Sequence, residues 1–151
     1  MANAATETPA AYLLAGQFHD HVRAMIDAME PDHDYLAIEL LKYSERILGN
    51  VGAAEAPFAA DKRQEHYRIA FSAMCGCASA CDIVRRLRLA PREHAEGAAR
   101  ALGSLAALVR PIAEEGLEDR DEEEKAILDD IFDTLESDEP WKEARDDEEA
   151  W

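Results

Sequence analysis

Residues 65–89, which read EHYRIAFSAMCGCASACDIVRRLRL, decide the fold of this chain. Their apolar side chains return every three to four residues, the spacing that places them on one face of an α-helix. The members of this stripe are Tyr67, Ala70, Phe71, Met74, Cys77, Ala78, Cys81, Val84 and Leu87. The segment therefore predicts a long amphipathic helix that buries one face in a core and ends in a basic run.

Four other segments show the same periodicity and predict an all-α chain. Pro31 ends a first helix, and the second runs from there to a loop predicted over residues 52–60. Pro91 marks a tight corner after the long third helix, and Gly116 ends the fourth. A fifth, shorter helix is expected from about residue 121 to residue 135, with acidic residues in its first turn.

The apolar repeats divide the chain into a helical bundle and an acidic extension. We assign residues 1–113 to a four-helix bundle, residues 114–136 to an acidic helical extension, and residues 137–151 to an acidic tail of disordered composition. The sequence leaves open whether the extension packs on its own bundle or on another chain. The core residues predicted from the stripes are Phe18, Val22, Leu40, Ile47, Tyr67, Phe71, Cys81, Val84, Leu102, Leu105 and Val109.

The net charge of −17 is unevenly distributed along the 151 residues. Residues 114–151 hold 19 acidic and four basic side chains, a net of −15, whereas residues 1–113 hold 14 acidic and 12 basic ones, a net of −2. Within residues 61–110 the sign reverses, with nine basic and five acidic side chains. Such a split favours polyanion contact on one side and an interaction tail on the other, or simply solvated faces.

Several classes of protein find no support in the composition. The chain has no apolar run of 18 residues and no signal-peptide pattern at its start, so we expect a cytoplasmic protein that does not enter a membrane. Three clustered cysteines do not suggest a disulfide framework. The sequence also shows no Gly-rich phosphate loop, no Ser-His-Asp order and no paired catalytic carboxylates, so we expect neither an enzyme nor a cofactor.

Cysteines and histidines supply the only metal candidates. Cys77 and Cys81 share a helix face as i and i+4, while Cys75 points elsewhere, so the two are weak candidates for a soft metal or a redox response. Buried cysteine also packs as a small apolar residue, and core packing is the favoured interpretation. His19 and His21 are expected on different faces of the first helix, which makes them poor co-ligands.

Arg85, Arg86, Arg88 and Arg92 form the candidate nucleic-acid or partner-binding set at the end of the third helix. On a continuous helix Arg85 would share a face with Arg88, and Arg88 with Arg92. Facing a phosphate backbone, such a cluster would supply salt-dependent affinity. Surface solubility, or salt bridges to acidic residues on a neighbouring subunit, is the plainer alternative.

The third helix also resembles a known family. His66-Tyr67-Arg68-Ile69-Ala70, together with residues 77–89, is similar to the family of proteins encoded in intervening sequences of 23S ribosomal RNA, which includes the accessory variability protein of diversity-generating retroelements. Residues 105–112 and a degraded match at residues 47–56 extend the resemblance. It implies an up-down four-helix bundle, here with an additional short C-terminal helix and an acidic tail.

The resemblance also implies a homo-oligomer, and the retroelement branch of the family is a basic homopentamer that binds nucleic acid and a reverse transcriptase. This chain departs from the family pattern at Ser72-Ala73 and Gly76, where a Gly-Ser pair and a glutamate are usual, and it lacks the strong basic charge. The expected function is therefore a non-enzymatic, self-associating interaction or scaffold protein. The alternatives are a nucleic-acid-binding accessory protein whose acidic tail covers the arginine set, and a metal-binding or redox-responsive bundle.

Overall fold

The computed structural model describes residues 9–116 and 122–136. This part of the chain contains no strand, so the all-α prediction is confirmed. Its elements are α1 (Ala10–Ala28), the 3₁₀ helix η1 (Pro31–His33), α2 (Asp34–Ala54), the 3₁₀ helix η2 (Pro57–Lys62), α3 (Arg63–Leu87), α4 (Arg92–Glu114) and α5 (Glu122–Glu136). The predicted acidic tail, residues 137–151, lies outside the described residues, as does residue 121.

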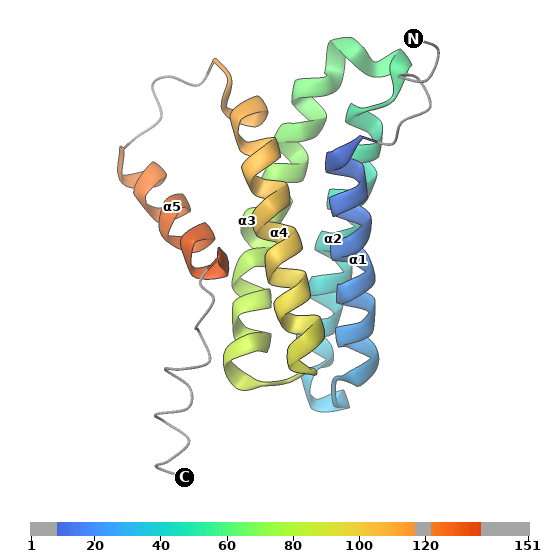
Figure 1. Ribbon diagram of the computed structural model, residues 1–151, viewed down its shortest axis with the longest axis vertical. Helices are drawn as coiled ribbons and strands as arrows, with labels where there is room; N and C mark the ends of the chain where they lie inside the picture. Colours follow the sequence, from blue (N-terminus) through green and yellow to red (C-terminus); the bar gives the residue numbers. More distant parts are fainter. Residues whose placement is uncertain (1–8, 117–121, 137–151) are drawn as a thin grey trace.

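The four long helices lie side by side along the long axis of the molecule (Figure 1). α1 packs against α2 and α4, and α3 packs against the same two helices. The start of α2 and the end of α3 lie at the same end of the molecule, and α5 lies across α3 and α4. In the described ranges, no helix is long and apolar enough to cross a lipid bilayer.

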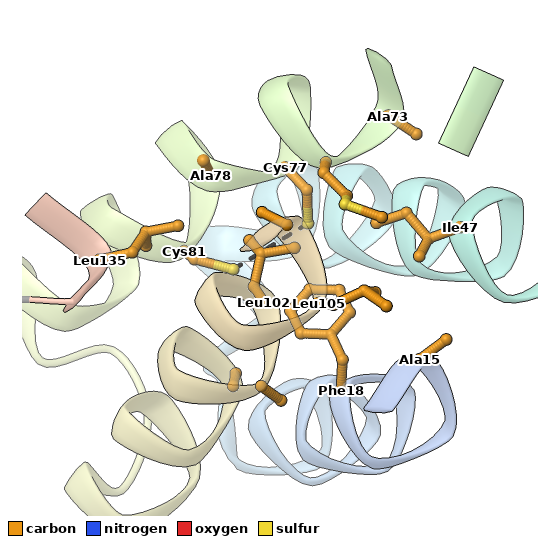
Figure 2. Packing of buried hydrophobic residues seen from close by; sticks show 14 of the residues in the cluster. Ala15, Phe18, Ile47, Ala73, Cys77, Ala78, Cys81, Leu102, Leu105 and Leu135 are labelled. Atoms are coloured by element: carbon orange, nitrogen blue, oxygen red, sulfur yellow. Dashed lines mark hydrogen bonds between the residues drawn. The ribbon is translucent and has the colours of Figure 1, made fainter. Parts of the chain in front are cut away.

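The core forms where the apolar stripes of the helices meet. All eleven side chains predicted for the core are buried. Figure 2 shows Phe18 of α1 beside Leu102 and Leu105 of α4, with Cys77 and Cys81 of α3 nearby. Alanines fill much of the remaining contact between α3 and α4, and their small size lets the two helices approach closely.

α5 belongs to this same core. Leu128, Phe132 and Leu135 are buried, and the Phe132 ring stacks on Phe71 of α3 with 5.7 Å between ring centroids. The structure thus places the acidic extension on its own chain, a point that the sequence left open. The boundary drawn at residue 113 does not separate two independent cores.

The connection between α2 and α3 differs from the loop predicted over residues 52–60. α2 continues to Ala54, and Pro57, whose fixed φ suits a first helical position, opens η2. Side chains tie the two helices together across this turn: Glu55 accepts hydrogen bonds from the Tyr67 hydroxyl and from Arg63, whose Nη2 lies 3.3 Å away. These tertiary contacts hold the entry of α3, whose first turn has no side-chain cap.

Two side chains of α3 complete the C-terminus of α4. Gln64 Nε2 donates to the carbonyl oxygens of Ile112 and Glu115 at 3.1 and 2.7 Å, and Arg68 Nε donates to that of Ala113 at 3.0 Å. The last carbonyls of a helix have no partner within the helix, so α3 satisfies them here. These hydrogen bonds fix the position of α4 along the axis of α3.

Candidate functional site

Arg85, the first member of the predicted binding set, is not on the surface. The residue is 2% exposed, and its Nη1 donates to the Thr134 carbonyl oxygen of α5 at 3.4 Å. Position 85 lies four residues beyond Cys81 on the buried side of α3, which α5 covers. The prediction that Arg85 is open to a nucleic acid or partner is therefore wrong.

The remaining three arginines do not form one face. Arg88 has a φ of 54°, the left-handed conformation that ends α3, so the helical spacing that would align it with Arg85 or Arg92 is broken there. Arg86 Nε lies 2.8 Å from Asp82, and Arg92 Nε lies 3.0 Å from Glu96. Each of these two guanidinium groups is thus paired within its own helix.

The acidic extension covers little of this set. α5 contacts Arg85 through a backbone carbonyl, whereas the side chains of Arg86 and Arg92 remain about half exposed, at 51% and 54%. A tail that mimics phosphate would have to reach the exposed members as well. Within the described residues, the end of α5 covers Arg85 and leaves Arg86 and Arg92 about half exposed.

The cysteines lie in the core. Cys77 and Cys81 are buried with their sulfur atoms 4.0 Å apart. The hydrogen bond with Cys81, together with burial, raises the pKa of the Cys77 thiol well above its ordinary value. A neutral thiol is a poor metal ligand, because the thiolate is the form that binds. The described ranges contain no group of three or more side chains placed to hold a metal ion.

His19 and His21 point to different neighbours, as the spacing predicted. His19 Nδ1 lies 3.0 Å from Ser44 Oγ of α2, and that hydroxyl donates to the Leu41 carbonyl oxygen. His21 faces α4, where its ring centroid lies 6.0 Å from that of His94. It sits over Gly97, so close that a Cβ there would lie 2.4 Å from the His21 ring.

An apolar face along the outside of α2 and α3 is a feature that the core stripes do not reveal. Ile69, Gly76 and Ile83 are spaced by seven residues, so they share one line of α3, and Leu87 continues this line. Ile69 and Gly76 line a shallow pocket of about 450 Å³ with Arg46 of α2. Because residues of α2 and α3 line this pocket together, the line of α3 faces outward beside α2.

Tyr35 stands beside this line on a row of α2 that also carries Glu39, Lys42 and Arg46. It precedes Arg46 by eleven residues, about three helical turns, and lies at the end of α2 that meets the end of α3 (Figure 1). We call Tyr35, Ile69, Ile83 and Leu87 the outer α2–α3 face. Their exposed fractions are 61%, 41%, 39% and 62%.

The spacing of Ile69 and Ile83 could have been noticed in the sequence, because both fall outside the predicted stripe of α3. The prediction that Leu87 is the last buried member of that stripe is wrong: the residue is 62% exposed, because it lies about 120° around the helix from Cys81. The close approach of Tyr43 to Gly76 could not have been noticed. A Cβ on Gly76 would lie 2.8 Å from the Tyr43 ring, so the glycine makes room for an aromatic side chain of the neighbouring helix.

No protein-family model, no curated protein and no solved structure matches this chain. The resemblance to the intervening-sequence and accessory-variability family therefore stays a prediction.

Proposed function

We propose that the protein is a non-enzymatic interaction module, an up-down four-helix bundle with an added helix, that self-associates through the outer α2–α3 face. The observation that carries this proposal is the exposure of Tyr35, Ile69, Ile83 and Leu87 on two neighbouring helices. Scattered apolar side chains are normal on a surface, whereas a set gathered along one face is typical of an interface.

Charge favours a second copy of the chain as the occupant of this face. Residues 1–113 carry a net charge of only −2, so two such faces can approach without strong repulsion. α5 packs against α3 and α4 and not against α2, which keeps its acidic side chains away from the contact. Association through this face therefore separates the acidic helices of the two copies.

The test is the oligomeric state of the full chain. Light scattering after size exclusion, run from about 1 to 100 µM, should give a homo-oligomer, and native mass spectrometry should give the copy number. The family resemblance implies five copies. A monomer throughout this range would refute self-association.

A matched pair of variants locates the contact. Leu87→Glu places a charge on the outer α2–α3 face and should dissociate the oligomer, because an unpaired charge buried in an interface is costly. Leu108→Glu is the control, since Leu108 is also exposed, at 45%, but lies on α4 away from that face. Equal behaviour of the two variants would move the contact elsewhere.

A further inference from the structure

α5 lies in a groove between α3 and α4 and packs there as one amphipathic helix packs on two others. Leu128, Phe132 and Leu135 are spaced by four and three residues, so they form one apolar stripe, and this stripe is buried. Phe132 stacks on Phe71, which lies on α3 in the wall of the groove. Ile127 lies about 100° around α5 from Leu128, on the flank of this stripe, and is 57% exposed.

Two arginines of the groove contact α5 in its middle and at its end, and a third lies near its start. Arg68 and Glu124 line the same pocket near the start of α5. Arg110 Nη1 lies 2.7 Å from Asp129 in the middle, and Arg85 donates to the Thr134 carbonyl oxygen at the end. A cation is favourable at the C-terminus of a helix, where carbonyl groups lack partners. The groove is therefore built to receive an acidic helix in this direction.

α5 itself fits this groove incompletely. Its fifteen residues carry seven acidic side chains and one lysine, and its last turn has no basic residue. The three acidic residues of its first turn suit the helix dipole, whereas the acidic residues of its last turn oppose it and the like charges repel one another, so docking contributes to the stability of this helix. A pocket of about 310 Å³, lined by Phe71, Cys75 and Leu128 among others, remains between α5 and the groove.

We propose that the α3–α4 groove is a docking site for an acidic amphipathic helix of a partner protein, and that α5 holds this site in cis until the partner displaces it. The charges of the groove and its apolar floor define the partner's pattern: apolar residues spaced by four and three, with acidic residues between them. A larger side chain at the level of Leu128 would reach into the pocket that α5 leaves and give the partner its advantage.

This surface is distinct from the outer α2–α3 face, so the proposal does not depend on self-association. It also extends beyond the arginine set predicted from the sequence, because only Arg85 belongs to both. A partner helix can bind only those molecules whose groove is not filled by α5. Its apparent affinity for the protein is therefore the intrinsic affinity multiplied by the fraction of molecules with an open groove.

The experiment titrates a fluorescent peptide of residues 122–136 into the full-length chain. Phe132→Ala empties the cis site, since it removes the central α5 contact and leaves the groove intact. We expect the peptide to bind this variant at least about tenfold more tightly than it binds the unaltered chain, because cis occupancy no longer competes. Binding should weaken as salt rises, since it depends on the ion pair of Arg110 with Asp129 and on the placement of the Arg85 guanidinium at the helix end.

Two peptides serve as controls of opposite direction. A peptide with Phe132→Asp should not bind, and one with Leu128→Phe should bind more tightly than the original. Leu128→Asp in the chain is a second way to release α5, should Phe132→Ala disturb the fold as judged by circular dichroism. Its groove is likewise unaltered.

Three results would overturn the proposal. The first is absence of peptide binding to either variant, and the second is equal binding to the variants and the unaltered chain. The third is an oligomer that is lost in Phe132→Ala but kept in Leu87→Glu, because it would assign the groove to α5 of a second copy. Comparing Phe132→Ala with Leu87→Glu separates failure of the groove proposal from failure of the self-association proposal.

Discussion

The contact between His21 and Gly97 gives the sharpest test of the packing of α1 against α4. Three ring atoms of His21 would lie 2.4 to 2.8 Å from a Cβ on Gly97. Real contacts are not this short, so Gly97→Ala must push the imidazole out of its place. Forcing extra volume into a packed contact costs about 1–3 kcal/mol.

The same substitution has a favourable side, because alanine is a better helix former than glycine. Within a helix the gain is about 1 kcal/mol. The expected net effect of Gly97→Ala on the unaltered chain is therefore a loss of about 0–2 kcal/mol in the free energy of unfolding. In the His21→Ala background the clash is absent, and the same change should stabilise by about 1 kcal/mol.

The assay is urea unfolding followed by circular dichroism on the four members of this double-mutant cycle, with the slope against urea held in common. Gly16→Ala is the control for propensity alone, since a Cβ on Gly16 would meet nothing within 4 Å. It should stabilise in both backgrounds. If Gly97→Ala has the same effect with and without His21, the packing argument is refuted.

Three further outcomes follow from other contacts. Leu102→Ala, in the fully buried centre, should lower the free energy of unfolding by about 2–5 kcal/mol in the same urea assay, and a loss below 1 kcal/mol would mean that the site collapses freely. Burial, followed by the hydrogen bond to Glu55, raises the pKa of Tyr67 above its ordinary value of about 10, so the folded state resists the ionisation that the unfolded state undergoes. Stability is then complete below about pH 10 and falls as pH rises above it, and unfolding curves from pH 8 to 11 should show a smaller fall for Tyr67→Phe. Gln64→Ala removes the side-chain donor to the Ile112 carbonyl and one of the two donors to the Glu115 carbonyl, which still accepts from Arg68, and we expect a loss of about 0.5–1.5 kcal/mol by thermal unfolding, against no comparable loss for the exposed neighbour change Glu65→Ala.

The helices and their buried faces could be predicted because both depend on local periodicity. The stripe of α3 from Tyr67 to Val84 is buried as its spacing required. Helix ends were less predictable, since tertiary contacts such as that of Glu55 with Tyr67 hold the start of α3, which has no side-chain cap. The sequence holds no local signal for such a contact, because its partners are twelve residues apart and on different elements.

Arg85 shows why the arginine set could not be judged from sequence. Its place beside Cys81 and Val84 on the helical wheel put it at the border of the apolar stripe, where either burial or exposure is consistent with the spacing. What decided the outcome was α5, whose last carbonyls cover that border. A helix added from a distant segment can thus change one member of a charged cluster from surface to core while its neighbours stay exposed.

The geometry of the exposed faces also constrains the copy number. A single self-complementary face such as the outer α2–α3 face closes a twofold pair, whereas a ring of five needs a second, different face on each copy. Leu13 is 52% exposed on α1, a helix outside that face, and is the candidate for the second surface. Leu13→Glu should therefore break a pentamer into smaller species in native mass spectrometry, while leaving a twofold pair unchanged. A pentamer that survives this substitution would exclude α1 from the ring contact.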